Sequence, residues 1–370
     1  MTFNSENLSI VFDLGTTEIK GAVMKNDGTL VQKVTQQNYT TVTDSNRHEQ
    51  DAIFWWKAIC SVSNKLCESH KIHSVIVTGQ MQNLLLLNTK GSPLQEVILY
   101  SDQRSIEESE WLLQNSCYLD LVAKTGNEQG PTSLLAKLLW IKKHQPEIFS
   151  KTNCLLPGAS DYVVFRMTGE KATDTTTAST TGLMELVERK WIDDALFNKM
   201  GLQGVQTLLP KLFDGGAKIG ELQKKAATDL GIPAGLPVFL GPGDAGSATI
   251  GAGCGVPGKA YAYIGTSGWV AFAEKQPADP TTGVITLSHP KCDHFIQVAP
   301  LLTAGGNLEW AKSLSNFESY DSLINDAISS PLSNLIFLPY LKGERSPFID
   351  PKARGAFIGL QSTTGQSAMN

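Results

Sequence analysis

Two segments far apart in the chain share one pattern, and this pattern restricts the fold more than any other feature. The first is FDLGTTEIKGAV, Phe12–Val23, and the second is AYIGTSGWVAFA, Ala262–Ala273. Each has an apolar strand, a Gly-Thr-hydroxyl corner and a second apolar strand, which is typical of a hairpin. Such an internal repeat predicts two related domains, each with a Gly-Thr hairpin. A chance likeness between two unrelated hairpins is the alternative at this point.

The length and the order of the expected elements agree with such a fold. A chain of 370 residues is too long for one small core, so two domains are expected. The residue patterns predict strands at 8–13, 19–25, 73–80 and 97–105, and helices at 48–66 and 131–147. Thr132 or Ser133 is the expected cap of the second helix. A β-rich start followed by alternating strands and helices is typical of the α/β class.

Composition excludes several classes of partner. The net charge of −5 argues against binding to nucleic acid or to an anionic membrane. The longest apolar run, Leu84–Leu87, is too short to cross a bilayer. We find no signal peptide at the start, and the six cysteines form no Cys-x-x-Cys pair, so a cytoplasmic protein with reduced thiols is expected.

One cluster raises the question of a metal. His289, Cys292 and His294 lie in the segment HPKCDH and could ligate zinc. A structural zinc site needs four ligands, and a fourth is not evident nearby. The cluster is therefore expected to have a structural role beside a strand.

The first Gly-Thr corner has the composition of a phosphate site. Gly15, Thr16 and Thr17 expose backbone amides and two hydroxyls without bulky side chains, which suits a phosphate. Asp13 could hold Mg²⁺ beside that phosphate, and Lys20 could add positive charge. A hairpin whose Asp caps its own turn is the structural alternative.

The second corner favours the phosphate interpretation. Two such hairpins facing each other across a cleft would hold ATP from both sides. Asp244 lies at a strand-to-helix corner, GPGDAGSA, and could take the proton from an attacking hydroxyl. The chain has no P-loop and no protein-kinase signature set. A hydrolase with Asp13 and Asp244 as paired carboxylates stays open, although it would have no need of phosphate hairpins.

With these residues identified, the chain resembles the FGGY carbohydrate kinases, and among them the xylulokinase-like members. The matching stretches cover nearly the whole chain and include VTGQMQNLLLLN, ILYSDQRS, SDYVVFRMTGE, GPGDAG and GERSPFIDPKARGAFIGL. The resemblance implies an actin-like, ribonuclease-H-like duplicated α/β fold. ATP is expected in the cleft and the sugar deep against the first domain, with domains at 1–243 and 244–370.

The resemblance also implies roles for individual residues. Asp244 is expected to be the catalytic base and to touch the sugar, and Asp13 to place Mg²⁺. The first phosphate loop is implied to be Thr16, Thr17 and Lys20, the second Gly265, Thr266 and Ser267, and the helix start facing the nucleotide Gly305 and Gly306. The implied sugar-side residues are Gln80, Met81, Gln82, Asp102 and Arg104.

Three departures from the family pattern bear on the substrate and on activity. Xylulokinases usually have Gln-Met-His-Gly at Gln80–Asn83, and Asp-Asn at Asp244–Ala245. Both differences fall near the sugar and weaken the expectation of xylulose more than that of a kinase. The resemblance still implies a ketopentose such as D-xylulose as the substrate, with gluconate, ribulose or another polyol open. The family also continues beyond the position of Asn370 with a further glycine-rich motif, so the second domain is expected to be incomplete.

That third departure leaves two other functions open. A sugar-binding remnant without catalysis is one alternative, and an actin-like chaperone or filament protein shares the fold and is another. The resemblance also allows a homodimer.

Overall fold

The protein is described by a computed structural model that covers residues 7–361, except positions 45, 68–69, 292, 316, 332–333, 349 and 351. Its main sheet has six strands in the order β14-β15-β6-β1-β2-β3. These are β1 Leu8–Leu14, β2 Glu18–Lys25, β3 Leu30–Gln37, β6 Ile72–Gly79, β14 Ala217–Glu221 and β15 Pro237–Leu240. β1, β6 and β15 are parallel neighbours, so their carboxyl ends meet at one edge of the sheet. Ligands of open α/β sheets bind at such an edge.

Helices and a first core cover this sheet. Helices α1 (Ala52–Cys67), α6 (Ala159–Thr168) and α9 (Lys224–Leu230) pack against the sheet and against one another. Alternate residues of β1, including Ile10 and Phe12, are fully buried beneath them. Trp55 and Trp56 on α1 belong to this core, as the helical pattern of the sequence predicts.

A second, mainly helical layer lies beside the sheet. It contains α2 Ile106–Gln114, α3 Tyr118–Thr125, α4 Leu134–His144, α5 Pro146–Lys151, α7 Thr175–Ala178 and α8 Asp194–Lys199. Small sheets border it. One has three strands, β4 Thr41–Thr43, β5 Arg47–Gln50 and β8 Val97–Ile98. The others have two strands each: β7 Leu85–Leu87 with β9 Cys154–Leu156, β10 Ala172–Asp174 with β13 Lys211–Phe213, and β11 Met184–Glu185 with β12 Lys190–Trp191. The predicted cap of α4 is confirmed at Ser133, whose hydroxyl accepts from Ala136 N. Trp140 packs in the core of this layer.

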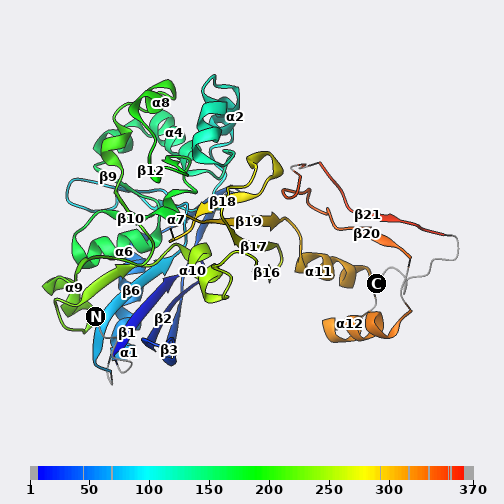
Figure 1. Ribbon diagram of the computed structural model, residues 1–370, viewed down its shortest axis with the longest axis horizontal. Helices are drawn as coiled ribbons and strands as arrows, with labels where there is room; N and C mark the ends of the chain where they lie inside the picture. Colours follow the sequence, from blue (N-terminus) through cyan, green and yellow to red (C-terminus); the bar gives the residue numbers. More distant parts are fainter. Residues whose placement is uncertain are drawn as a thin grey trace.

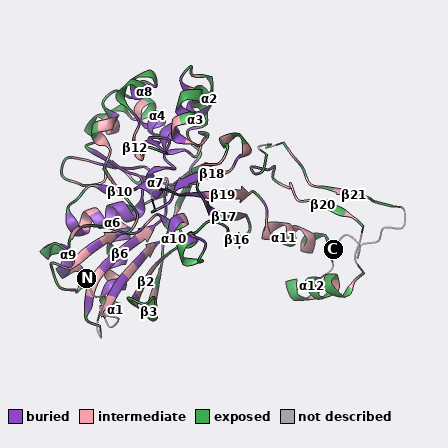
Figure 2. Ribbon diagram, in the orientation of Figure 1, coloured by how far each residue is buried: buried purple, intermediate pink, exposed green. Residues whose placement is uncertain are grey.

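The C-terminal part is built around a second sheet in the order β16-β17-β19-β18. Its strands are β16 Ala260–Ile264, β17 Gly268–Glu274, β18 Ile285–Ser288 and β19 Phe295–Leu301. Helix α10 (Asp244–Gly251) precedes this sheet, and α11 (Gly305–Leu314), α12 (Tyr320–Ser329), β20 (Ile336–Leu338) and β21 (Ala356–Ile358) follow it. In Figure 1 the last four elements extend away from the main sheet. Figure 2 shows that burial is concentrated in the N-terminal layers.

The two predicted Gly-Thr hairpins are confirmed as hairpins. β1 and β2 are antiparallel and close at the pair Leu14–Ile19, and β16 and β17 close at Ile264–Gly268. The turn at Asn26–Gly28, whose sequence NDG is typical of a tight turn, also lies between two paired strands. The boundary expected between Gly243 and Asp244 stays a prediction.

Two predicted elements differ in the structure. The predicted helix at 48–66 begins only at Ala52, because residues 47–50 pair as β5 and the Asp51 carboxylate accepts from Ile53 N at 2.7 Å. The predicted strand at 97–105 is shorter and ends at Ile98. The chain turns there because Asp102 N donates to Leu99 O and the Asp102 carboxylate accepts from Arg104 N.

Candidate functional site

The first Gly-Thr corner is held from behind by two amide side chains. Asn38 Nδ2 donates to Gly15 O at 2.9 Å, and Gln50 Nε2 donates to Thr16 O at 2.8 Å. N–H and C=O point in opposite directions across a trans peptide, so the amides of the next residues lie on the side away from these partners. A Cβ on Gly15 would come within 2.8 Å of Glu18 O, so this turn requires glycine. The corner is therefore a rigid bend with its donors turned outward, the geometry that an anion requires.

Asp13 is the penultimate residue of β1, beside this corner. It pairs across the hairpin with Lys20. Burial raises the pKa of the Asp13 carboxyl, and the charges of Lys20 and Lys33 partly oppose that shift. A carboxylate with a raised pKa beside a phosphate-type corner fits a divalent cation, whose charge would stabilise the ionised form.

Asp244 begins α10 directly after β15 and the Gly241–Gly243 corner. Ala245 N donates to its Oδ1 at 2.8 Å, and Asp174 Oδ1 accepts from Gly243 N at 3.3 Å. Desolvation by the surrounding protein, with smaller contributions from the charges of Asp13 and Asp174, raises the pKa of Asp244 to about 7, although the residue is exposed. A carboxylate titrating near neutral pH is suited to general acid–base chemistry.

A cavity of about 300 Å³ opens in front of Asp244. It is lined by Met81, Gln82, Tyr100, Thr180, Asp244, Ala245, Trp269, Ile285, Leu287 and Val298. Gln82 has a left-handed φ of 58°, and its Nε2 donates to Thr180 O. A non-glycine residue at positive φ is often found at a functional site. The cavity thus brings two predicted sugar-side residues, Met81 and Gln82, to the predicted base.

The other three predicted sugar-side residues direct their polar groups to protein partners. Gln80 accepts from Thr16 Oγ1 and donates to Gln50 Oε1, so it braces the first corner. Arg104 pairs with Asp102 and Glu49, each at 2.7 Å; the side chains of Arg104 and Asp102 are buried, and that of Glu49 is partly exposed. Burial would raise the pKa of Asp102, but hydrogen bonds from Arg104 and from His48 N hold it below its usual value. Burial would lower the pKa of Arg104, but Asp102 and Glu49 raise it. Direct sugar contact by these three residues stays a prediction.

The second hairpin and α11 form one unit. The corner carbonyls accept from the first amides of the helix: Gly305 N donates to Gly265 O at 2.7 Å, and Gly306 N donates to Thr266 O at 3.0 Å. A Cβ on Gly305 would lie 2.6 Å from Gly265 O, so the two backbones approach as closely as glycine allows. The predicted nucleotide residues Gly265, Thr266, Gly305 and Gly306 are therefore brought together, and Ser267 closes the corner by accepting from Gly265 N.

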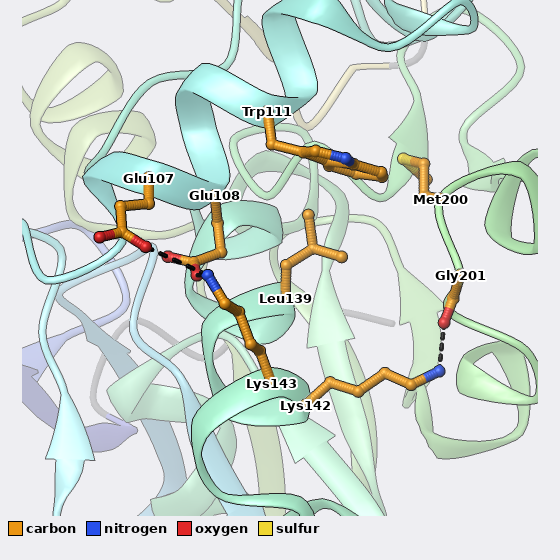
Figure 3. Close-up of a pocket in the computed structure, with 8 residues that line it drawn as sticks. All are labelled: Glu107, Glu108, Trp111, Leu139, Lys142, Lys143, Met200 and Gly201. Carbon is orange, nitrogen blue, oxygen red and sulfur yellow. Dashed lines mark hydrogen bonds and ion pairs between the residues drawn. The ribbon is translucent and has the colours of Figure 1, made fainter.

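A larger cavity, of about 490 Å³, lies away from Asp244 between α2, α4 and the end of α8. Figure 3 shows the amine of Lys143 pointing toward the carboxylates of Glu107 and Glu108, and Lys142 reaching Gly201. His144 also approaches Glu108, at 3.2 Å. These charged groups pair with one another, and we assign no chemistry to this cavity.

The His289, Cys292 and His294 cluster, for which a structural role was expected, is only partly described. His289 and His294 are both buried, with ring centroids 5.7 Å apart, while Cys292 lies outside the described residues. Burial lowers the pKa of His289. Arg189 donates to the carbonyls of both histidines and so ties this loop to the N-terminal part.

Sequence reasoning missed Tyr100, Thr180, Trp269 and Asp174 as site residues. Trp269 follows the second corner, and Tyr100 precedes Asp102 in a stretch that we had singled out, so both had a local signal. Thr180 and Asp174 belong to the segment ATDTTTASTT, whose run of hydroxyls was the available sign. None of the described helices is long and apolar enough to span a membrane.

The comparisons with known proteins agree with this geometry. The model of the FGGY family of carbohydrate kinases, N-terminal domain, matches residues 8–251, and that of its C-terminal domain matches residues 260–369. A xylulose kinase of Escherichia coli (strain K12) is 31% identical over 371 residues, which covers 97% of this chain and 74% of that protein.

Solved structures give the same result. A ligand-bound xylulose kinase from Lactobacillus acidophilus has a TM-score of 0.88 at 28% identity and covers 98% of this chain and 74% of its own. A gluconate kinase from the same organism has a TM-score of 0.87 at 27% identity, with coverages of 98% and 75%. These similarities confirm the expected actin-like α/β fold. The chain belongs to the FGGY family of carbohydrate kinases and is a sugar phosphotransferase.

Proposed function

We propose that the protein transfers the γ-phosphoryl group of Mg-ATP to a hydroxyl of a ketopentose such as D-xylulose. One observation carries this proposal: Asp244, with its raised pKa, lines a sugar-sized cavity together with Met81 and Gln82. The relatives named xylulose kinase support the substrate class.

Asp244 is the proposed general base. Its Oδ1 accepts from Ala245 N, so Oδ2 is the oxygen left to take the proton of the sugar hydroxyl. Mg-ATP would supply the phosphoryl group. Asp13 would hold the cation. Its charge raises the pKa of Asp244, so this carboxylate lies near the proposed base and beside the first corner.

The two hairpins are the proposed phosphate sites. Thr16, Thr17 and Lys20 on the first, and Gly265, Thr266 and Ser267 on the second, would hold the phosphates, with Gly305 and Gly306 fixing the second corner. Positioning and charge neutralisation provide most of the catalysis in phosphoryl transfer.

The cavity favours a neutral sugar over gluconate. None of the described residues that line it is basic, and Asp244 would repel a substrate carboxylate. The side-chain oxygen of Gln82 is the expected acceptor for a sugar hydroxyl, because its nitrogen is bonded to Thr180 O. Gluconate remains the second candidate, since a gluconate kinase is also a structural neighbour.

The test is an ADP-release assay with D-xylulose, D-ribulose, L-ribulose, gluconate and glycerol, and a control without sugar. We expect turnover with a ketopentose, and a drop of about 10²- to 10⁴-fold in Asp244→Asn, with sugar binding by calorimetry retained. Full activity of Asp244→Asn would refute its role as base. Sugar binding without turnover in the unmodified chain would instead establish the sugar-binding remnant.

A further inference from the structure

Lys137 is a buried cation outside the residues considered so far. It lies in the middle of α4, its exposed fraction is 0%, and leucines 134, 135, 138 and 139 surround it in the helical sequence. Burial lowers the pKa of its ammonium to about 7; the charge of Asp102 opposes that shift and the charge of Arg104 adds to it. A buried amine is unfavourable unless it is hydrogen-bonded, so its partner identifies its role.

The partner is the carbonyl of Leu99. Lys137 Nζ donates to Leu99 O at 2.6 Å, and this oxygen also accepts from Asp102 N at 3.1 Å. The second bond closes the turn Leu99–Asp102. Among the described residues, Leu99 O is the only hydrogen-bond partner found for Lys137 Nζ. The same oxygen closes the turn by accepting from Asp102 N.

The turn leads from the helical layer into the cavity. Tyr100, its second residue, lines the cavity with Asp244 and Gln82. Leu99 N donates to His48 O, and Asp102 accepts from His48 N, so both ends of the turn are fixed to β5. Lys137 adds a third support from a different element, α4.

We propose that Lys137 is a positioning residue that fixes the Leu99–Asp102 turn so that Tyr100 is held against the sugar. This inference rests on the proposed function, because it assigns the sugar to the cavity that Tyr100 lines. An apolar side chain of similar length would fill the same space without a buried amine, so packing alone does not explain a lysine here.

Lys137→Met is the decisive variant. It keeps the volume and removes the hydrogen bond, so the protein is expected to fold with an unchanged or higher Tm. We expect KM for the sugar to rise about tenfold, with kcat and KM for ATP within about twofold. An unchanged KM for the sugar would overturn the inference.

Two further variants separate positioning from stability. Ile141→Ala, on the same helix and fully buried, is the matched control: it should lower Tm and leave the sugar KM unchanged. Tyr100→Ala tests whether Lys137 acts on sugar binding through Tyr100. Lys137→Met should add no more than about twofold to the sugar KM in the Tyr100→Ala background. Independent, additive effects would contradict positioning through Tyr100.

Hydrogen exchange gives a readout that does not need turnover. In Lys137→Met the amides of residues 97–104 should exchange faster while those of β1 and β6 stay unchanged. If the unmodified chain phosphorylates no sugar, the proposed function fails, and this exchange result alone decides whether Lys137 holds the turn. Unchanged exchange at residues 97–104 would show that Lys137 does not hold the Leu99–Asp102 turn.

Discussion

At the residue scale, the proposed catalysis depends on the protonation of one carboxylate. Desolvation by the surrounding protein, together with the charges of Asp13 and Asp174, raises the pKa of Asp244 to about 7. The protein therefore stabilises the neutral acid, which cannot accept a proton from the sugar. The ionised base becomes the main form only above that pKa.

This shift predicts an acid limb in the pH profile. The kcat/KM for the sugar should fall about tenfold per pH unit below about pH 7 and level off above it, since the base must be deprotonated. Steady-state rates between pH 5 and pH 9 provide the measurement.

Asp174→Asn tests whether the charge of Asp174 contributes to this pH profile. It can keep the cap on α7, where Thr177 N donates to Asp174 Oδ1, but it removes one negative neighbour of Asp244. The acid limb should move to lower pH in this variant. A limb that does not move would show that Asp174 does not influence the base.

At the element scale, the proposed second phosphate site is a contact between a hairpin and a helix. The carbonyls of Gly265 and Thr266 bind the first amides of α11, so the corner keeps its shape only while the helix lies against it. Glycine at 305 and 306 permits this close approach.

Gly305→Ala should separate the two elements. Its Cβ would lie 2.6 Å from Gly265 O, a backbone atom that has no rotamer with which to move away. We expect KM for ATP to rise about tenfold or more, with sugar affinity unchanged, because Gly305 contacts the proposed phosphate corner and does not line the proposed sugar cavity. Kinetics with ATP as the varied substrate, together with sugar calorimetry, would measure this.

Gly251→Ala is the control for Gly305→Ala. It adds the same methyl group at the end of α10, where no atom lies within 4 Å of the new Cβ. It should leave both substrates unaffected. An effect on ATP from Gly251→Ala, or none from Gly305→Ala, would contradict the proposed contact.

The elements also show what a sequence can predict. Both Gly-Thr hairpins, the cap at Ser133 and the Asp244 corner were predictable because each depends on neighbours in the chain. Tyr100 was not, because it reaches the cavity only through a turn fixed by His48 and Lys137 from two other elements. A place near the sugar was expected for Asp102 and Arg104 from the family resemblance, which does not show that the two side chains pair with each other.

At the scale of the whole molecule, burial is uneven (Figure 2). Two large cores lie in the N-terminal layers, whereas α11 has no buried residue and α12 only Leu323. Large apolar side chains are exposed in this part, including Ile328 at 78% and Ile336 at 58%. Segments with little buried apolar surface open at a low free-energy cost.

The second sheet is nevertheless fixed to the N-terminal part through β18. Asn127 Nδ2 donates to Thr286 O, and Thr286 N donates to Asn127 Oδ1, both at 2.8 Å, so one side chain pairs with the edge strand as a neighbouring strand would. Ser288 N donates to Ser179 Oγ at 3.0 Å beside it. β18 and β19 should therefore resist opening longer than the elements that follow them.

Limited proteolysis should reveal this order. A broad-specificity protease is expected to cut first within residues 302–361 and to leave a resistant fragment ending near β19, because the strands up to β19 are paired and fixed by Asn127. Mass spectrometry of the early fragments would locate the cuts. Asn127→Ala removes both bonds to Thr286 and should move early cuts upstream, into residues 275–301. Equal cleavage across the chain, or early cuts within β1–β6, would show that the C-terminal elements are not the least stable part.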